Sequence, residues 1–308
     1  MIKLKQLYEA GADPAKVDPK RFPKKLSAVD QKAAAKYVTQ GQKDNEPDDD
    51  IIAVDDDEPT VVDLKPSQTS MNNPKAMSFV VRALNQGEPF EGTDVLKNNA
   101  GDLGAFTSND GHIMDGHHRW IAVGMVNPKA KLKVNKIDFP SDQLIGILNA
   151  LTKGAFNIPK GKEASGGFEQ FARGPIEGKI DDVIANGTSF GDSPEVVKAA
   201  FTKLIGKEGE TVDDETLAKE TKAKITSNIG SLNFTLPPGA PERPDMPVIS
   251  KKAGHVKQAI DALKGGDIDI VPPYATVEDG YDPKTRRLWK AFNTFIIKEY
   301  FQKTARIK

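Results

Sequence analysis

Three of the four histidines in the chain lie within the ten residues Gly111 to Trp120, beside an aspartate, two glycines and an arginine. The centre of this stretch is Asp115-Gly116-His117-His118-Arg119. If a helix starts at His117, its first turn favours phosphate, because the N–H groups there lack intrahelical partners and the helix dipole is positive. Arg119 adds a fork of donors that suits phosphate oxygens, and the imidazoles add further donors. The residue types therefore predict a phosphate-binding site.

A hairpin and a short helix are the elements expected to position this stretch. Asn109-Asp110-Gly111 is a strong signal for a tight turn, and Ile113 with Met114 predicts a short apolar return strand. From His117 onward the apolar residues follow helical periodicity, and Asn127-Pro128 ends the pattern. A strand, a glycine turn and a helix start are thus predicted in direct succession.

These residues resemble the phosphate-binding motif of the ParB/sulfiredoxin superfamily, and the resemblance extends over about residues 59–153. Val61-Val62-Asp63-Leu64-Lys65-Pro66-Ser67-Gln68 is similar to the opening strand of that family, and Asn73-Pro74-Lys75-Ala76-Met77 to the helix start that follows. Lys131-Leu132-Lys133-Val134 is similar to the strand after the motif helix. His117 stands where sulfiredoxins have their catalytic cysteine. The Asp-Gly-His-His-Arg form is closest to free serine kinases and to ParB-like domains of tailed phages.

The resemblance implies an α+β fold: a compact ParB/sulfiredoxin-like domain with helical and extended N- and C-terminal extensions. It also implies a nucleotide, ATP or ADP with Mg²⁺, whose phosphates are bound by Gly116, His117, His118 and Arg119. Asp115 and His117 are the candidate catalytic residues. In the free serine kinases, acids in the loop after the first strand assist phosphoryl transfer. This chain has Gln68 there, and a glutamine cannot act as a base.

Two other interpretations of the cluster stay open. A transition metal is one, since His112, Asp115, His117 and His118 are suitable ligand types. Adjacent helical residues diverge by about 100°, however, so neighbouring histidines rarely bind one ion together, and we predict no tightly bound zinc. The other is a domain that keeps the fold without any activity.

The amino-acid composition excludes several classes of protein and chemistry. The chain has 308 residues and no cysteine, which excludes disulfides and thiol chemistry. No apolar run is long enough to span a bilayer and no signal peptide is recognisable, so we expect no membrane association and a location in the host cytoplasm or the virion. Charge is uneven along the chain, with ten acidic residues and no Lys or Arg in residues 44–63.

Four regions are predicted along the chain. They are an N-terminal helical extension (1–43), an acidic linker (44–58), the ParB/sulfiredoxin-like domain (59–153) and a mostly helical C-terminal region (154–308) with a Pro-rich connector (235–249). A last helix from Asp282 presents a large aromatic face, which is either core or a surface for self-association or for other phage proteins. Helices at 193–205 and 214–225 resemble a DNA-binding pair only in spacing, and Asp213-Asp214-Glu215 opposes phosphate, so DNA is not favoured there.

Two functions are therefore expected from the sequence. One is a phage-type ParB-like protein with a nucleotide-phosphate site, acting as a phosphotransferase or nucleotide hydrolase. The alternative is a non-enzymatic phage structural or accessory protein that uses this fold as an assembly module.

Overall fold

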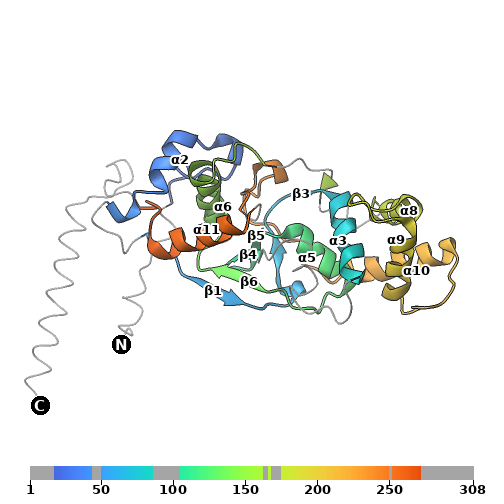
Figure 1. The fold of residues 1–308 in the computed structure, drawn as a ribbon. Helices are drawn as coiled ribbons and strands as arrows, with labels where there is room; N and C mark the ends of the chain where they lie inside the picture. The colour runs from blue at the N-terminus through green and yellow to red at the C-terminus, as the bar shows by residue number, and fades with distance from the viewer. Residues whose placement is uncertain are drawn as a thin grey trace, which may run out of the picture.

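A five-stranded sheet lies at the centre of the computed structural model, with helices on both faces (Figure 1). The structure describes residues 17–43, 50–85, 105–161, 166–167, 175–249 and 252–271. The predicted α+β class is confirmed. The strand order is β1-β6-β4-β5-β2, and a separate two-stranded sheet pairs β3 (Ser70–Met71) with β7 (Gly166–Gly167).

The predicted hairpin forms the middle of the large sheet. Its strands are β4 (Ala105–Ser108) and β5 (His112–Asp115), which pair antiparallel with a register shift between Phe106 and Thr107. β6 (Val134–Ile137) lies parallel to β4, and β1 (Val54–Asp57) closes that edge antiparallel to β6. β2 (Lys65–Pro66) lies parallel to β5 on the other edge. The motif strand β5 is therefore internal to the sheet.

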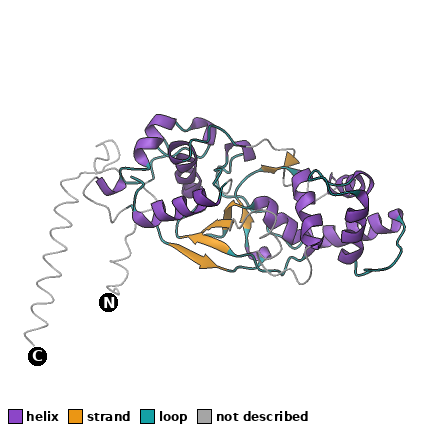
Figure 2. Cartoon of the chain, in the orientation of Figure 1, coloured by secondary structure: helices purple, strands orange, loops and turns teal. Residues whose placement is uncertain are grey.

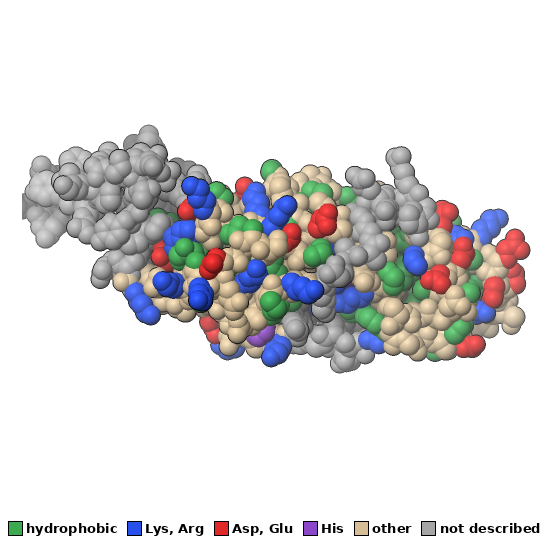
Figure 3. All heavy atoms as spheres, turned by 90° about the horizontal axis from the view of Figure 1, so that it is seen from above, with side chains coloured by type: hydrophobic (Ala, Val, Ile, Leu, Met, Phe, Trp, Pro, Cys, Tyr) green, Lys and Arg blue, Asp and Glu red, His purple; other side chains and the backbone are tan. Residues whose placement is uncertain are grey.

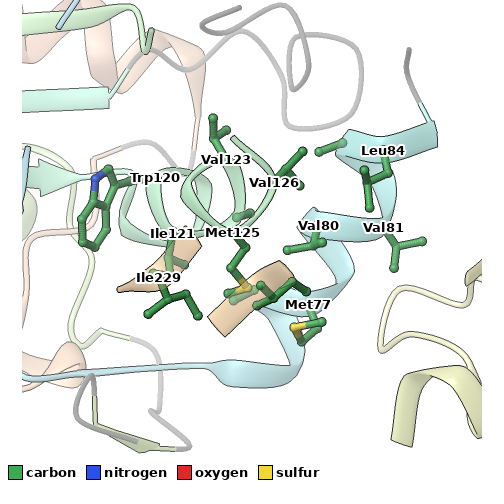
Figure 4. Packing of buried hydrophobic residues seen from close by; sticks show 14 of the residues in the cluster. Met77, Val80, Val81, Leu84, Trp120, Ile121, Val123, Met125, Val126 and Ile229 are labelled. Atoms are coloured by element: carbon green, nitrogen blue, oxygen red, sulfur yellow. The ribbon is translucent and has the colours of Figure 1, made fainter. Parts of the chain in front are cut away.

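Successive side chains of β5 point to opposite faces of the sheet, and each face is covered by a separate hydrophobic core. Ile113 belongs to a core built with α3 (Asn73–Asn85), α5 (His117–Val126), α8 (Pro175–Asn186), α9 (Pro194–Leu204) and α10 (Asp214–Ile229). The apolar face of α3, with Met77, Val80, Val81 and Leu84, is fully buried. Figure 4 shows this face packed beside Ile121 and Met125 of α5 and Ile229 of α10.

Met114 belongs to the second core, on the opposite face of the sheet (Figure 2). This core contains α2 (Gln31–Tyr37), α6 (Ser141–Ala150), the π-helix Leu151–Ala155 and α11 (Ala253–Gly265). The 3-10 helices Leu26–Ala28 and Gly41–Lys43 flank α2. The backbone at Phe22 lies close to Gly146 of α6, since a Cβ at Gly146 would lie 2.1 Å from the carbonyl oxygen of Phe22. Glycine is needed there because the two backbones meet.

The opening strand is shorter than expected. The resemblance placed it within Val61 to Gln68, but Val61–Asp63 forms a 3-10 helix and the strand is only Lys65–Pro66. Val61 and Leu64 are buried, so their apolar pattern indicated burial and not strand pairing. α8 lies in the C-terminal region that was expected to be mostly helical.

The predicted boundaries at residues 43, 58 and 153 stay predictions, but packing crosses each of them. The first core joins residues from Val61 to Leu232, and the second joins residues from Phe22 to Val271. The aromatic helix expected from Asp282 lies outside the described residues. Within the described part of the chain, no helix combines the length and the apolar character required to cross a bilayer.

Candidate functional site

Gly116 turns the end of β5 directly into the start of α5. Its φ of 112° and ψ of 7° place it in the left-handed region, where a side chain is strained. The amide N–H groups of Arg119 and Trp120 both donate to the Gly116 carbonyl, 2.9 Å away, and so close the first turn. The predicted strand, glycine turn and helix start are all observed. Trp120 fixes the helix behind them, since its buried indole Nε1 donates to the Val61 carbonyl at 2.8 Å.

His117 is buried against the loop between β2 and α3. Its side chain is 3% exposed, and its Nε2 accepts from the backbone N–H of Ser67 at 3.0 Å. Burial, followed by the positive charges of Arg243 and His112, lowers the pKa of His117 to about 3. The imidazole is therefore neutral, with its proton on Nδ1. To take a proton from a substrate at Nε2, His117 must first release the Ser67 N–H.

His118 makes the same kind of contact with the other end of this loop. Its Nε2 accepts from the backbone N–H of Asn72 at 3.1 Å. The two adjacent histidines thus hold residues 67–72 (the site loop) at both ends. Their side chains diverge and contact main-chain groups five residues apart. The histidines were expected to donate to phosphate, and their acceptor role could not be predicted because a backbone partner leaves no signal in the residue types.

Arg119 and Asp115 flank the junction. The Arg119 side chain lies on the first turn of α5 and only 8% of the residue is exposed. Asp115 is half-buried at the end of β5, opposite Phe106 in the sheet. The structure therefore keeps Asp115, Gly116, His117, His118 and Arg119 at one strand-to-helix junction. A buried guanidinium at a helix start suits an oxyanion.

The site loop contains no carboxylate. Gln68 is 4% exposed, and its Nε2 donates to the Ser70 carbonyl at 2.8 Å, so its amide shapes the loop. Asp63, an acid close to the loop in sequence, accepts from Thr60 Oγ1. Among the described residues no group of three or more His, Asp or Glu side chains is arranged to hold a metal ion. A Mg²⁺ ion here would depend on nucleotide phosphates, with Asp115 as the carboxylate at the junction.

Arg243 is a residue that sequence analysis missed. It lies in the 3-10 helix Arg243–Asp245 of the Pro-rich connector, 124 positions after Arg119, and it is 8% exposed. Two hydrogen bonds bring the connector to the site loop. The Thr69 N–H donates to the Pro241 carbonyl at 2.9 Å, and the Arg243 N–H donates to the Ser70 side-chain hydroxyl, Oγ, at 3.0 Å. Arg243 is the one basic residue of 235–249, which is the only signal its sequence offered.

A second polar cluster surrounds Asp110 in the hairpin turn. The Asp110 carboxylate accepts from Ser108 Oγ, from Ser141 Oγ at 2.7 Å and from the Ser141 N–H at 3.2 Å. His112 Nδ1 lies 3.2 Å from Asp110 Oδ2, and His112 is 5% exposed. Partial burial raises the pKa of Asp110, but the hydrogen bonds of His112, Ser108 and Ser141 outweigh it and hold the pKa well below its ordinary value. The cluster joins the hairpin to the first residue of α6.

Comparisons with known proteins add no relative to this picture. No family model, no curated protein and no solved structure matches the chain. The resemblance to the ParB/sulfiredoxin superfamily therefore stays a prediction from the motif.

Proposed function

We propose that the protein binds the phosphate groups of a nucleotide, ATP or ADP, at the junction between β5 and α5. The observation that carries the proposal is a buried arginine, Arg119, on the first turn of a helix that starts after a left-handed glycine. Helix start and guanidinium both favour an oxyanion, and burial strengthens such interactions by lowering the local dielectric.

The other residues of the junction have supporting tasks in this proposal. His117 and His118 hold the site loop beside α5 through the N–H groups of Ser67 and Asn72. Arg243 adds positive charge near His117. Asp115 faces a Mg²⁺ ion that the phosphates carry. Within the described residues neither a carboxylate base in the site loop nor a metal-binding cluster supports catalysis, so the proposal is limited to binding.

A second candidate function follows from the histidines. Both use Nε2 to accept main-chain N–H groups, as expected if the motif serves only to fold the domain. The protein is then a non-enzymatic assembly module of the phage type, and its junction binds no nucleotide.

Thermal unfolding with millimolar ATP, ADP or CTP, each with and without Mg²⁺, separates the two functions. Ligand at 100 times its Kd stabilises a folded protein by about 2.7 kcal/mol, which gives a clear increase in Tm. Arg119→Ala should abolish this increase. Arg82→Ala is the control, because Arg82 lies on α3, where its guanidinium packs 4.2 Å from the centre of the Phe190 ring. A wild-type Tm that no nucleotide changes would favour the assembly module.

A further inference from the structure

Within the described part of the chain, positive charge is concentrated in residues 17–43, which form the N-terminal unit. This unit contains α2 and its two flanking 3-10 helices. It has seven Lys or Arg residues and two Asp residues. It packs on α6 and the π-helix, in the second core, far along the chain from the junction at Gly116.

Five of these basic residues have no acidic partner among the described residues. Lys20, Lys25, Lys32, Lys36 and Lys43 are all exposed, and no carboxylate of the described residues lies within 4.0 Å of their ammonium groups. Arg21 differs, since it pairs with Asp269 at 2.9 Å. Both aspartates of the unit are occupied by backbone N–H groups: Asp30 accepts from Ala33 and Asp18 from Lys20.

In the helices α8 to α10, by contrast, acidic residues outnumber lysines and most lysines are paired with an acid. Residues 175–229 contain eleven acids and seven lysines, and four of the seven lysines are paired. The pairs are Lys179–Asp182, Lys198–Asp214, Lys207–Glu220 and Lys222–Asp181, at 2.7 to 3.3 Å. In Figure 3, Lys and Arg side chains gather over the half of the molecule that carries α2, and Asp and Glu side chains are frequent at the opposite end.

The geometry of α2 directs two of the unpaired lysines outward. Ala34 is 1% exposed and faces the core. Lys32 and Lys36 lie two residues before and after it, about 200° around the helix, so they project away from the protein. At a separation of four residues they are neighbours, and like charges at this spacing weaken a helix. A partner that carries negative charge would relieve this repulsion.

We propose that the N-terminal unit binds the phosphate backbone of a nucleic acid without reading its sequence. Exposed lysines on flexible stems neutralise successive phosphates, and counterion release drives such binding. The surface is separate from the nucleotide junction and from α9 and α10. Asp214 and Glu215 in the first turn of α10 oppose phosphate there.

The apolar surface favours nucleic acid over an acidic protein. Stable protein interfaces contain buried aromatic or aliphatic anchors near their centre. Among the described residues the exposed large hydrophobic side chains are Ile51, Val196 and Leu236, and none of them lies in the N-terminal unit. Phosphate contacts need no such anchor, because they position a backbone through charge.

Fluorescence anisotropy of a labelled DNA duplex of arbitrary sequence, titrated with the full chain, tests this proposal. If about three or four phosphates are contacted, affinity should fall roughly 40- to 150-fold between 50 and 200 mM salt. The double variant Lys32→Gln/Lys36→Gln should weaken binding and reduce the slope of log K against log salt by about 2. The matched control is Lys219→Gln/Lys224→Gln, which removes two exposed, unpaired lysines from α10.

Each outcome decides the proposal. Salt-dependent binding that weakens in the α2 variant and not in the α10 variant supports it. No binding at 50 mM salt, or equal loss in both variants, overturns it. Parallel titrations use polyglutamate and phosphatidylserine vesicles. Equal or tighter binding to either of these assigns the surface to an acidic protein or a lipid and overturns the choice of nucleic acid.

Discussion

His112 and His117 lie five residues apart, yet the groups around the two imidazoles are opposite in charge. His112 Nδ1 faces the carboxylate of Asp110 at 3.2 Å, in a cluster completed by Ser108 and Ser141. His117 faces a backbone N–H and the positive charge of Arg243. Around His112, the Asp110 carboxylate accepts hydrogen bonds from several donors. Around His117, the neutral imidazole is itself the acceptor.

This difference shows that the surroundings of a histidine cannot be predicted from a histidine-rich motif alone. The left-handed Gly116 sends the chain from the sheet into a helix, so His112 and His117 belong to different elements with different neighbours. A phosphate site needs donors, and His117 offers none at Nε2, because that atom accepts from Ser67. The positive charge for a phosphate therefore has to come from arginine.

The largest expected effect comes from truncating the buried acceptor. His117→Ala should lower the free energy of unfolding by about 2–4 kcal/mol at pH 7, because it leaves the buried Ser67 N–H without an acceptor and creates a cavity. His118→Ala should cost less, about 1 kcal/mol, since the Asn72 N–H is only partly buried. Urea unfolding measures both. Equal losses would mean that burial does not distinguish the two histidines.

The pH dependence of this loss sharpens the comparison. The folded-state pKa of His117 is about 3, below the ordinary value of 6.5, so the unfolded chain binds a proton that the folded one excludes. The wild type should therefore lose stability as pH falls from 6.5 toward 3. The gap between wild type and His117→Ala should narrow over that window. A constant gap would show that His117 does not titrate in this way.

Asp110 should give a smaller effect in a different window. Asp110→Asn should cost about 1–2 kcal/mol at pH 7, since three hydrogen bonds weaken but the side chain is 42% exposed and screened by solvent. The pKa of Asp110 is lowered, so its contribution is present above the unfolded value of about 4 and is lost as pH falls below it. The gap between wild type and variant should therefore close only below about pH 4, in unfolding measured from pH 3 to 7.

Much of this arrangement follows from local patterns. The turn at Asp110, the start of α5 at His117 and the buried face of α3 all have strong residue-type signals, and all three are observed. The contacts that define the site do not. Ser67 and Asn72 donate main-chain N–H groups to the histidines of α5. Arg243 belongs to a connector far along the chain and contacts Ser70 of the site loop, and all of these contacts depend on tertiary packing.

The same limit explains why the opening strand does not include Val61 and Leu64. Val61 and Leu64 are buried beneath Trp120 and the first core, and their spacing of three fits a helical turn as well as their residue types fit a strand. Type alone favoured β structure. The hydrogen bond from Trp120 Nε1 to the Val61 carbonyl is a tertiary contact that stabilises this segment and that residue types alone do not reveal.

The smallest effect expected is purely electrostatic and concerns Arg243. Burial is the first cause of the lowered pKa of His117, and the charge of Arg243 is the second. Arg243→Gln removes the charge and leaves the imidazole buried, so the pKa of His117 should rise but stay below 6.5. The Arg243 N–H contact with Ser70 Oγ is a main-chain contact and remains available. NMR titration of the histidine Cε1–H signals from pH 2 to 7, a range that includes the wild-type pKa of about 3, measures the change, and Arg82→Gln is the control. ¹⁵N shifts at pH 7 should still report His117 protonated on Nδ1, because Ser67 continues to donate to Nε2.

An unchanged pKa of His117 would place Arg243 outside the electrostatic reach of His117, and a changed tautomer would show that Arg243 holds the site loop itself. Either result would remove Arg243 from the set of charges that distinguishes His117 from His112.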